Sequence, residues 1–269
     1  MDAHSDSLKD LLRRALRTQI DYGFEEVILD PLPAPPERPA PVMDSGSAQD
    51  EAQRQTGGEA DSQAALFGEA DTGNDPGEPE YESLKEHCRA ICDCTNCGLG
   101  HTRTKFVYGV GHPNAEIMFV GEAPGAEEDK RGEPFVGRAG QLLDKILAAM
   151  GLSRDQVYIT NILKCRPPNN RDPLPDEVEQ CIGYLYEQIR LIRPKIICAL
   201  GRVAAQNLLE TTTPLGKLRK RWHEFGGTPM MVTYHPAALL RFQQYKRDTW
   251  EDMQMLMARL DEMKAAQSG

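Results

Sequence analysis

The chain has 269 residues, a formal net charge of −10 and a hydrophobic content of 40%. This length allows one large domain or two small ones, and without an apolar run of about 18 residues we expect no membrane-spanning helix. The seven cysteines are an odd number, and the N-terminus lacks an export pattern. We therefore expect a cytoplasmic protein whose cysteines are metal ligands or buried thiols rather than disulfides.

The acidity of the chain is concentrated in its first 80 residues. Residues 1–80 hold 18 Asp and Glu against 6 Lys and Arg, whereas residues 81–269 hold 23 against 25. The second part is therefore compatible with a surface that contacts phosphates, although the whole chain is acidic.

Residues 1–80 are predicted to form a tail. Apolar residues at helical spacing from Leu8 to Ile20 predict a short helix, which could dock on an unidentified protein partner or remain transient. The Pro-rich stretch 31–41 cannot continue it, and polar and acidic residues dominate from there to Glu80. Such a composition has too little apolar surface to offset chain entropy, so we expect the tail to be largely disordered.

From residue 81 onward, short apolar runs alternate with helical patterns. Strands are predicted over residues 116–120, 157–163, 195–200 and 230–234, and helices over 138–150, 175–192, 201–210 and 246–264. This alternation implies right-handed crossovers and a parallel sheet covered by helices on both faces. We predict one α/β domain over residues 81–269, a three-layer αβα sandwich around a short, mainly four-stranded parallel sheet.

Three motifs follow predicted strands. The first strand leads into residues 121–129 (GEAPGAEED), with residues 134–140 (PFVGRAG) shortly after. The second strand ends in residues 160–168 (TNILKCRPP), and the fourth is followed by residues 234–241 (YHPAALLR). Open α/β sheets bind ligands at the carboxyl ends of their strands, so these motifs indicate one site.

Together the motifs resemble family 4 of the uracil-DNA glycosylase superfamily, the branch that carries an iron–sulfur cluster. The resemblance covers about residues 94–241 and no residue before about Tyr81. It implies a monofunctional DNA repair enzyme that hydrolyses the N-glycosidic bond of deoxyuridine. Its partner would be uracil-containing DNA, and we expect a monomer.

The resemblance also assigns four thiolates to a structural 4Fe–4S cluster: Cys94, Cys97, Cys165 and Cys181. A structural zinc uses the same kind of ligand set, and the spacing alone favours the cluster only modestly. Four cysteines lie within residues 88–97, so Cys88 or Cys92 could replace a ligand. Cys198 lies within an apolar run and is expected to be a buried, inert thiol.

A glycosylase of this kind must extrude the nucleotide and recognise its base in a closed pocket. The resemblance implies that Phe135 stacks on uracil, that the Asn161 amide reads N3–H and O4, and that His235 stabilises the leaving anion as a neutral donor. It places Glu128 beside the base, where its carboxylate would exclude the thymine methyl group. The first turn supplies the remaining pocket residues, Gly121 and Ala123.

The water and the DNA backbone require further residues. Glu122 is the best carboxylate for orienting the hydrolytic water, with a solvated turn carboxylate as the alternative. Leu239 and Leu240 are expected to wedge into the vacated base stack, or else to pack in the core. Arg241 is expected to contact backbone phosphates. Lys217 and Arg219, in the basic run of residues 217–221, are expected to do the same, unless this run is only a solvated loop.

Two other functions remain open at this point. A related branch captures uracil in DNA covalently through a histidine in an insertion after the second strand, but residues 166–173 (RPPNNRDP) contain no histidine. An accessory module for replication proteins would rest on the N-terminal helix alone. Release of free uracil with turnover separates the enzyme from both.

Overall fold

The computed structural model describes residues 81–267, and the expectations for the N-terminal tail and its helix lie outside these residues. The strands are β1 (Val110–Gly111), β2 (Ile117–Gly121), β3 (Tyr158–Asn161), β4 (Ile196–Leu200), β5 (Trp222–Phe225) and β6 (Thr228–Thr233). The α-helices are α2 (Leu84–Ile91), α3 (Ala126–Arg131), α4 (Arg138–Ala149), α5 (Pro175–Ile192), α6 (Arg202–Leu208), α7 (Leu215–Leu218), α8 (Pro236–Arg241) and α9 (Tyr245–Gln267). Two 3₁₀ turns, η1 (Gly98–His101) and η2 (Pro168–Asn170), lie between them.

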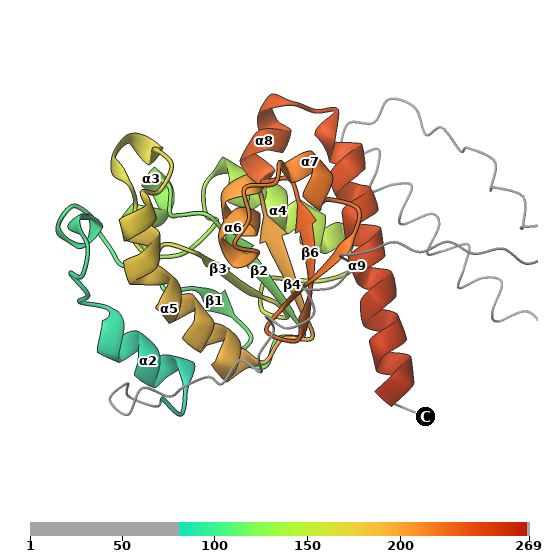
Figure 1. The fold of residues 1–269 in the computed structure, drawn as a ribbon, viewed down its shortest axis with the longest axis horizontal. Helices are drawn as coiled ribbons and strands as arrows, with labels where there is room; N and C mark the ends of the chain where they lie inside the picture. Colours follow the sequence, from blue (N-terminus) through green and yellow to red (C-terminus); the bar gives the residue numbers. More distant parts are fainter. Residues whose placement is uncertain (1–80, 268–269) are drawn as a thin grey trace, which may run out of the picture. The chain divides into compact units, whose positions relative to one another are not determined.

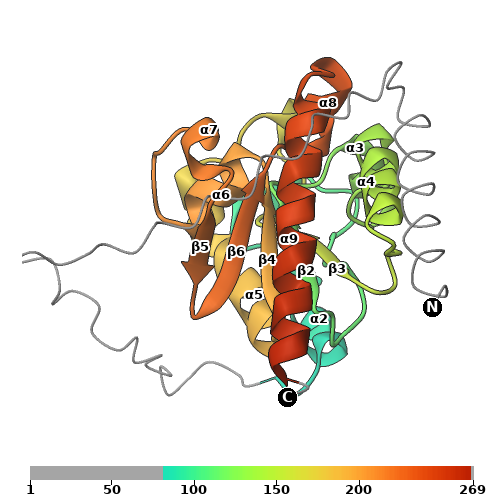
Figure 2. The ribbon, with the colours of Figure 1, turned by 90° about the vertical axis from the view of Figure 1, so that its right-hand side faces the viewer.

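The strands form one sheet in the order β1-β3-β2-β4-β6-β5 (Figure 1 labels β1 to β4 and β6, and Figure 2 labels β5). The four central strands are parallel, and β1 and β5 pair antiparallel at the two edges. The predicted parallel sheet is confirmed, and the edge strands are additions. β1 has only two residues and β5 is partly exposed, so neither presents the continuous apolar run that marks a buried strand.

Helices cover both faces of the sheet, which confirms the three-layer arrangement. Every residue of β2, β3 and β4 is buried. Figure 2 shows α9 in front of the sheet and α5 behind it. Within the core, Leu185 of α5 belongs to the same apolar cluster as Met118 and Ile197 of the central strands. No helix of residues 81–267 combines the length and the apolar character that crossing a bilayer requires.

The order of the strands determines where a ligand can bind. From β2 the chain crosses to β3 on one side, and then back past β2 to β4 and β6 on the other. Such a reversal leaves a crevice at the carboxyl ends of the strands. The register aligns these ends, since Gly121 pairs with Asn161 and Leu200 pairs with Thr233. All three sequence motifs therefore emerge at one edge of the sheet.

Candidate active site

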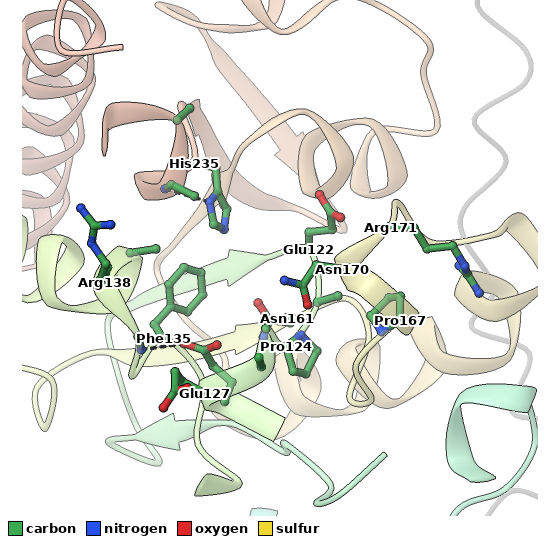
Figure 3. Close-up of a pocket in the computed structure, with 18 of the residues that line it drawn as sticks. Glu122, Pro124, Glu127, Phe135, Arg138, Asn161, Pro167, Asn170, Arg171 and His235 are labelled. Atoms are coloured by element: carbon green, nitrogen blue, oxygen red, sulfur yellow. Dashed lines mark hydrogen bonds between the residues drawn. The ribbon is translucent and has the colours of Figure 1, made fainter. Parts of the chain in front are cut away.

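A pocket of about 610 Å³ opens at this edge (Figure 3). Its walls come from the turn after β2, the segment that leads into α4, the loop after β3 and the first turns of α8. Segments more than 100 residues apart thus contribute to one cavity. The predicted site residues in its lining are Glu122, Ala123, Glu128, Phe135, Asn161, His235 and Arg241.

Gly121 makes room for two of these side chains. A Cβ at this position would lie 2.6 Å from the Phe135 ring and would also overlap the amide oxygen of Asn161. Only a glycine permits both side chains to approach the end of β2 so closely. The structure therefore supports a spatial role for Gly121 beneath the pocket lining.

The Phe135 ring is held by a strained loop. Its φ of 53° lies in the left-handed region, which is uncommon for a bulky residue. One carboxylate oxygen of Glu128 accepts hydrogen bonds from the backbone N–H groups of Val136 (2.9 Å) and Gly137 (2.8 Å). Glu128 lines the pocket, and these hydrogen bonds position the loop that carries Phe135. Exclusion of the thymine methyl group by Glu128 stays a prediction.

Arg154 fixes the other side of the same loop. Its guanidinium donates to the carbonyl oxygens of Pro134 (2.7 Å) and Phe135 (3.1 Å) and pairs with Asp144 at 2.9 Å. Residues 134–137 are therefore all hydrogen-bonded, the first two to Arg154 and the last two to Glu128, and these bonds offset the backbone strain. The sequence carries no signal for this role, because Arg154 lies in an ordinary polar turn after α4.

Asn161 presents an unpaired polar atom. The side chain is 2% exposed, and its Oδ1 has no hydrogen-bond partner in the described part of the chain. A buried acceptor of this kind costs about 1–3 kcal/mol unless a donor reaches it. Because Asn161 lines the pocket, a ligand with an N–H group would satisfy this atom.

The end of β3 is anchored by a buried lysine. The Lys164 Nζ donates to the Asn161 carbonyl oxygen (2.8 Å), the Thr160 hydroxyl (2.8 Å) and the Gln188 amide oxygen (2.7 Å). Burial lowers the pKa of Lys164 to about 7, and the Cys181 thiol opposes this shift. The network fixes the backbone that carries Asn161, a role that sequence reasoning did not assign to Lys164.

His235 is set up as a neutral donor. Its Nδ1 accepts a hydrogen bond from the Ala237 N–H at 3.1 Å, which assigns the ring proton to Nε2. Burial lowers the pKa of His235 to about 4, although the Glu128 carboxylate opposes the shift. The ring centroid lies 5.4 Å from that of Phe135. At neutral pH the imidazole is therefore uncharged and has one N–H to donate.

Glu122 is half-buried on the opposite wall (Figure 3). Burial raises the pKa of this carboxyl to about 7; the Asp172 carboxylate raises it further and the Arg202 guanidinium lowers it. Asp172 and Arg202 form an ion pair of 2.6 Å. The charges of Asp172 and Arg202 thus influence how much of Glu122 is ionised near neutral pH.

Asn170 is a further polar group of the pocket. Its Oδ1 accepts a hydrogen bond from Arg166 Nε at 2.8 Å, which leaves its NH₂ group for other partners. Figure 3 shows Asn170 beside Glu122. Sequence reasoning missed this side chain, although its position in the loop after a predicted strand was a signal for it.

The two leucines of the last motif have different environments. Leu239 is 1% exposed and packs in the core, so the prediction that it wedges into DNA does not hold. Leu240 is 40% exposed. Neighbouring residues of a helix point about 100° apart, so a single turn of α8 cannot present both side chains to one partner.

The three predicted phosphate-binding residues also differ in their exposure to solvent. The prediction that Arg219 contacts phosphates does not hold, because its side chain is buried and its Nε donates to Asp252 at 2.8 Å. Lys217 is exposed on α7 but is not part of the pocket lining, whereas Arg241 is exposed and lines it. From the run of basic residues in the sequence alone, a buried ion pair cannot be distinguished from a surface charge.

The four predicted cluster ligands come from two parts of the described chain. Cys165 and Cys181 are buried, and Cys94 and Cys97 are half-buried. Within residues 81–267, no three His, Cys, Asp or Glu side chains are arranged to hold a metal ion. Cys198 is fully buried as predicted, and burial raises the pKa of its thiol.

Hydrogen-bond donors point at three of these sulfur atoms. The Tyr184 hydroxyl donates to Cys94 Sγ (3.1 Å) and the Lys164 N–H donates to Cys181 Sγ (3.4 Å). Arg103 joins the two parts, since one guanidinium nitrogen lies 3.5 Å from Cys165 Sγ and 2.5 Å from the Cys94 carbonyl oxygen. These donors can stabilise negative charge on sulfur, whereas burial acts in the opposite direction and raises the pKa of the Cys165 and Cys181 thiols.

The profile of the family described as the uracil DNA glycosylase superfamily matches residues 108–254, which include every predicted pocket residue. The chain belongs to this superfamily. Three relatives place this glycosylase in the type-4 branch. The type-4 uracil-DNA glycosylase of Archaeoglobus fulgidus is 50% identical over 185 residues, 65% of this chain and 92% of the relative.

Two further type-4 uracil-DNA glycosylases are similar over comparable lengths. The protein of Sulfurisphaera tokodaii is 44% identical over 184 residues, 65% of this chain and 84% of the relative. The protein of Pyrobaculum aerophilum is 42% identical over 173 residues, 61% of this chain and 88% of the relative. The glycosylase thus spans nearly the full length of each of these relatives.

Proposed function

We propose that this glycosylase hydrolyses the N-glycosidic bond of deoxyuridine in DNA and releases free uracil, leaving an abasic site. The observation that carries the proposal is the buried amide oxygen of Asn161, which has no hydrogen-bond partner within residues 81–267 and shares one pocket with Phe135 and His235. The pocket volume of about 610 Å³ accommodates an extruded nucleotide. The named activity of the type-4 relatives supports the same reaction.

Recognition of uracil rests on Asn161 and Phe135. The Asn161 Oδ1 accepts from uracil N3–H and its NH₂ donates to O4, while the Phe135 ring stacks on the base. Cytosine presents an acceptor at N3 and a donor at C4, which reverses both contacts. The reversed contacts leave buried polar groups unpaired, and such mismatches discriminate by about 10⁴–10⁵ when the site is built for hydrogen bonding.

Departure of the base rests on His235. As the bond breaks, negative charge develops on the O2 side of uracil. A neutral imidazole with its proton on Nε2 donates a hydrogen bond to that charge without first losing a proton. A donor held in place before the reaction stabilises the transition state more than the bound substrate.

Orientation of the water and stabilisation of the sugar cation depend on Glu122. Its ionised carboxylate orients the water that attacks the sugar carbon and stabilises the positive charge of the oxocarbenium-like sugar. The Asn170 amide lies beside it and offers a second partner for the same water. The raised pKa of Glu122 makes its carboxylate a stronger base near neutral pH.

Contact with the DNA duplex depends on exposed residues of α7 and α8. The Leu240 side chain enters the stack that the extruded nucleotide leaves. Arg241 at the rim and Lys217 on α7 neutralise backbone phosphates, which positions the duplex without reading its sequence.

We further propose that the four cysteines of the family pattern hold a structural 4Fe–4S cluster. These ligands are Cys94, Cys97, Cys165 and Cys181. Four thiolates suit this cluster, and the donors that point at three of the sulfurs fit its negative charge. When bound, the cluster joins the segment after α2 to the loop after β3 and to α5.

The cluster is tested by its metal content. The purified protein should contain about four irons and absorb broadly near 400 nm, as four thiolates in this spacing imply. Cys165→Ala should lose iron and thermal stability, whereas the matched control Cys198→Ala should retain both. Stoichiometric zinc without iron after anaerobic purification would refute the cluster.

The reaction is tested by release of uracil from an oligonucleotide. With DNA in excess, the wild-type enzyme should release several equivalents of free uracil and leave alkali-labile abasic sites. A stable protein–DNA adduct formed in a single turnover would support covalent capture instead. Binding of uracil-containing DNA without release of uracil would contradict enzyme activity altogether.

A further inference from the structure

An aromatic side chain stands exposed at the end of α8. Phe242 caps this helix and is 47% exposed, and Leu240, two residues earlier, is 40% exposed. The Phe242 N–H donates to the Ala238 carbonyl oxygen at 2.8 Å, so the backbone at this position is fixed. One exposed apolar residue is ordinary on a protein surface. Here two lie at the end of the helix whose first turn lines the pocket, and we call these two residues the apolar tip.

The Phe242 ring packs against one end of a column of side chains. Its centroid lies 5.6 Å from that of Tyr245, with the two rings tilted at an interplanar angle of 54°. Tyr245 stacks on Tyr234 with centroids 4.1 Å apart and an interplanar angle of 10°. On the ring of Tyr234 lies the guanidinium of Arg219, 4.1 Å from the centroid. Arg219 is in turn held by Asp252 at 2.8 Å. The column extends from a buried ion pair to the exposed ring.

The column is continuous with the pocket. Tyr234 directly precedes His235, and Arg241, between the two exposed residues, lines the pocket rim. The apolar tip therefore adjoins a residue of the pocket rim in the chain. An exposed, rigidly supported aromatic ring in this place is suited to stacking, because every base presents a π-face.

We propose that Phe242 stacks on a base that neighbours the extruded nucleotide, while Leu240 fills the place that the nucleotide leaves. This inference rests on the proposed function of the pocket. The partner is a nucleobase of the substrate DNA, and its identity does not matter. Phe242 then contributes to the affinity for DNA and leaves the chemical step to the pocket residues.

Binding of a duplex with a stable abasic-site analogue tests the proposal. Phe242→Ala should bind this duplex about 5- to 150-fold more weakly, the range found when a base-stacking aromatic is replaced by alanine. Phe242→Trp should bind as well as the wild type. Tyr186→Ala is a matched control, since Tyr186 is 37% exposed on α5 and lies outside the pocket lining. This control should not change the affinity.

A fluorescent base locates the contact. With 2-aminopurine next to the abasic site, the wild type and Phe242→Trp should change its fluorescence, and Phe242→Ala should not. Equal affinity of Phe242→Ala and wild type, or an equal loss in Tyr186→Ala, would overturn the proposal. If the wild type releases uracil but Phe242→Ala binds normally, only this inference fails. If the wild type releases no uracil, the proposed function fails.

Discussion

At the scale of single residues, the hydrogen-bonding state of each pocket side chain is set by its neighbours. The Asn161 amide oxygen lacks a donor among the residues that the structure describes, and the His235 tautomer is set by the Ala237 N–H. Both the unpaired state of the amide oxygen and the tautomer of the imidazole depend on contacts in the folded chain, which the sequence motifs do not contain. The residue types could be predicted from their motifs, but the states of these side chains depend on the neighbours that the fold supplies.

Asn161→Asp should relax the discrimination between uracil and cytosine. A carboxylate can accept from the cytosine amino group but cannot donate to uracil O4. We expect cleavage of uracil to fall about 10⁴-fold if the paired hydrogen bonds carry the selectivity. The measurement is single-turnover cleavage of matched uracil- and cytosine-containing oligonucleotides. Unchanged uracil cleavage would remove Asn161 from recognition, even if the family assignment stands.

The rate of the chemical step should depend on pH through Glu122. Only the ionised carboxylate can orient water and stabilise the sugar cation, and its pKa is about 7. The rate should therefore rise about tenfold per pH unit below 7 and level off above it. His235, with a pKa of about 4, should add no inflection between pH 5 and 9. Single-turnover rates across this range provide the measurement.

Two variants show whether this inflection in the pH dependence belongs to Glu122. Glu122→Gln should abolish it and lower the plateau rate by about 10²-fold or more. Asp172→Asn should instead shift the inflection to lower pH, because the Asp172 carboxylate raises the pKa of Glu122. A wild-type rate that stays flat from pH 5 to 8 would exclude Glu122 as the titrating group.

At the scale of elements, the stacking aromatic depends on a loop that is clamped from two sides. Arg154→Ala removes two hydrogen bonds to carbonyl oxygens, at Pro134 and Phe135. Each charge-assisted bond contributes about 1.5–3 kcal/mol, so kcat/KM should fall at least about tenfold. Arg154→Lys should recover part of the loss. Arg259→Ala, on the exposed surface of α9, is the control and should not alter kcat/KM.

A double-mutant cycle shows whether Arg154 acts through Phe135. If it does, Arg154→Ala should cost little more in a Phe135→Ala background, because the ring that it positions is already absent. Fully additive losses in kcat/KM would contradict this positioning role. A drop in the melting temperature without a change in kcat/KM would assign Arg154 to stability alone.

The predictability of the elements follows from their burial. The central strands were predictable because residues buried on both faces form continuous apolar runs. The edge strand β5, at Trp222–Phe225, was not, since its side chains are partly exposed. Arg219 was misassigned because its charge is cancelled in the core by Asp252, which lies 33 residues later in the chain. Such pairings are tertiary and leave no local pattern.

At the scale of the whole molecule, charge is divided between two parts of the chain. Residues 1–80 hold 18 acidic against 6 basic residues, and residues 81–269 hold 23 against 25. The described pocket, its supporting network and the four proposed cluster ligands all lie in the second part. The chemistry should therefore need none of the first 80 residues.

Deletion of residues 1–80 should leave the single-turnover rate nearly unchanged and tighten DNA binding modestly, by about two- to tenfold at low salt. The reason is that a tethered acidic segment competes with phosphates for the basic residues of the domain. The gain should shrink as salt rises, because the Debye length falls to about 10 Å at 0.1 M. Neutralising the tail carboxylates by Asn and Gln substitution should reproduce the gain without shortening the chain. A truncated protein that is folded and contains iron but is inactive would show that the first 80 residues take part in the chemistry.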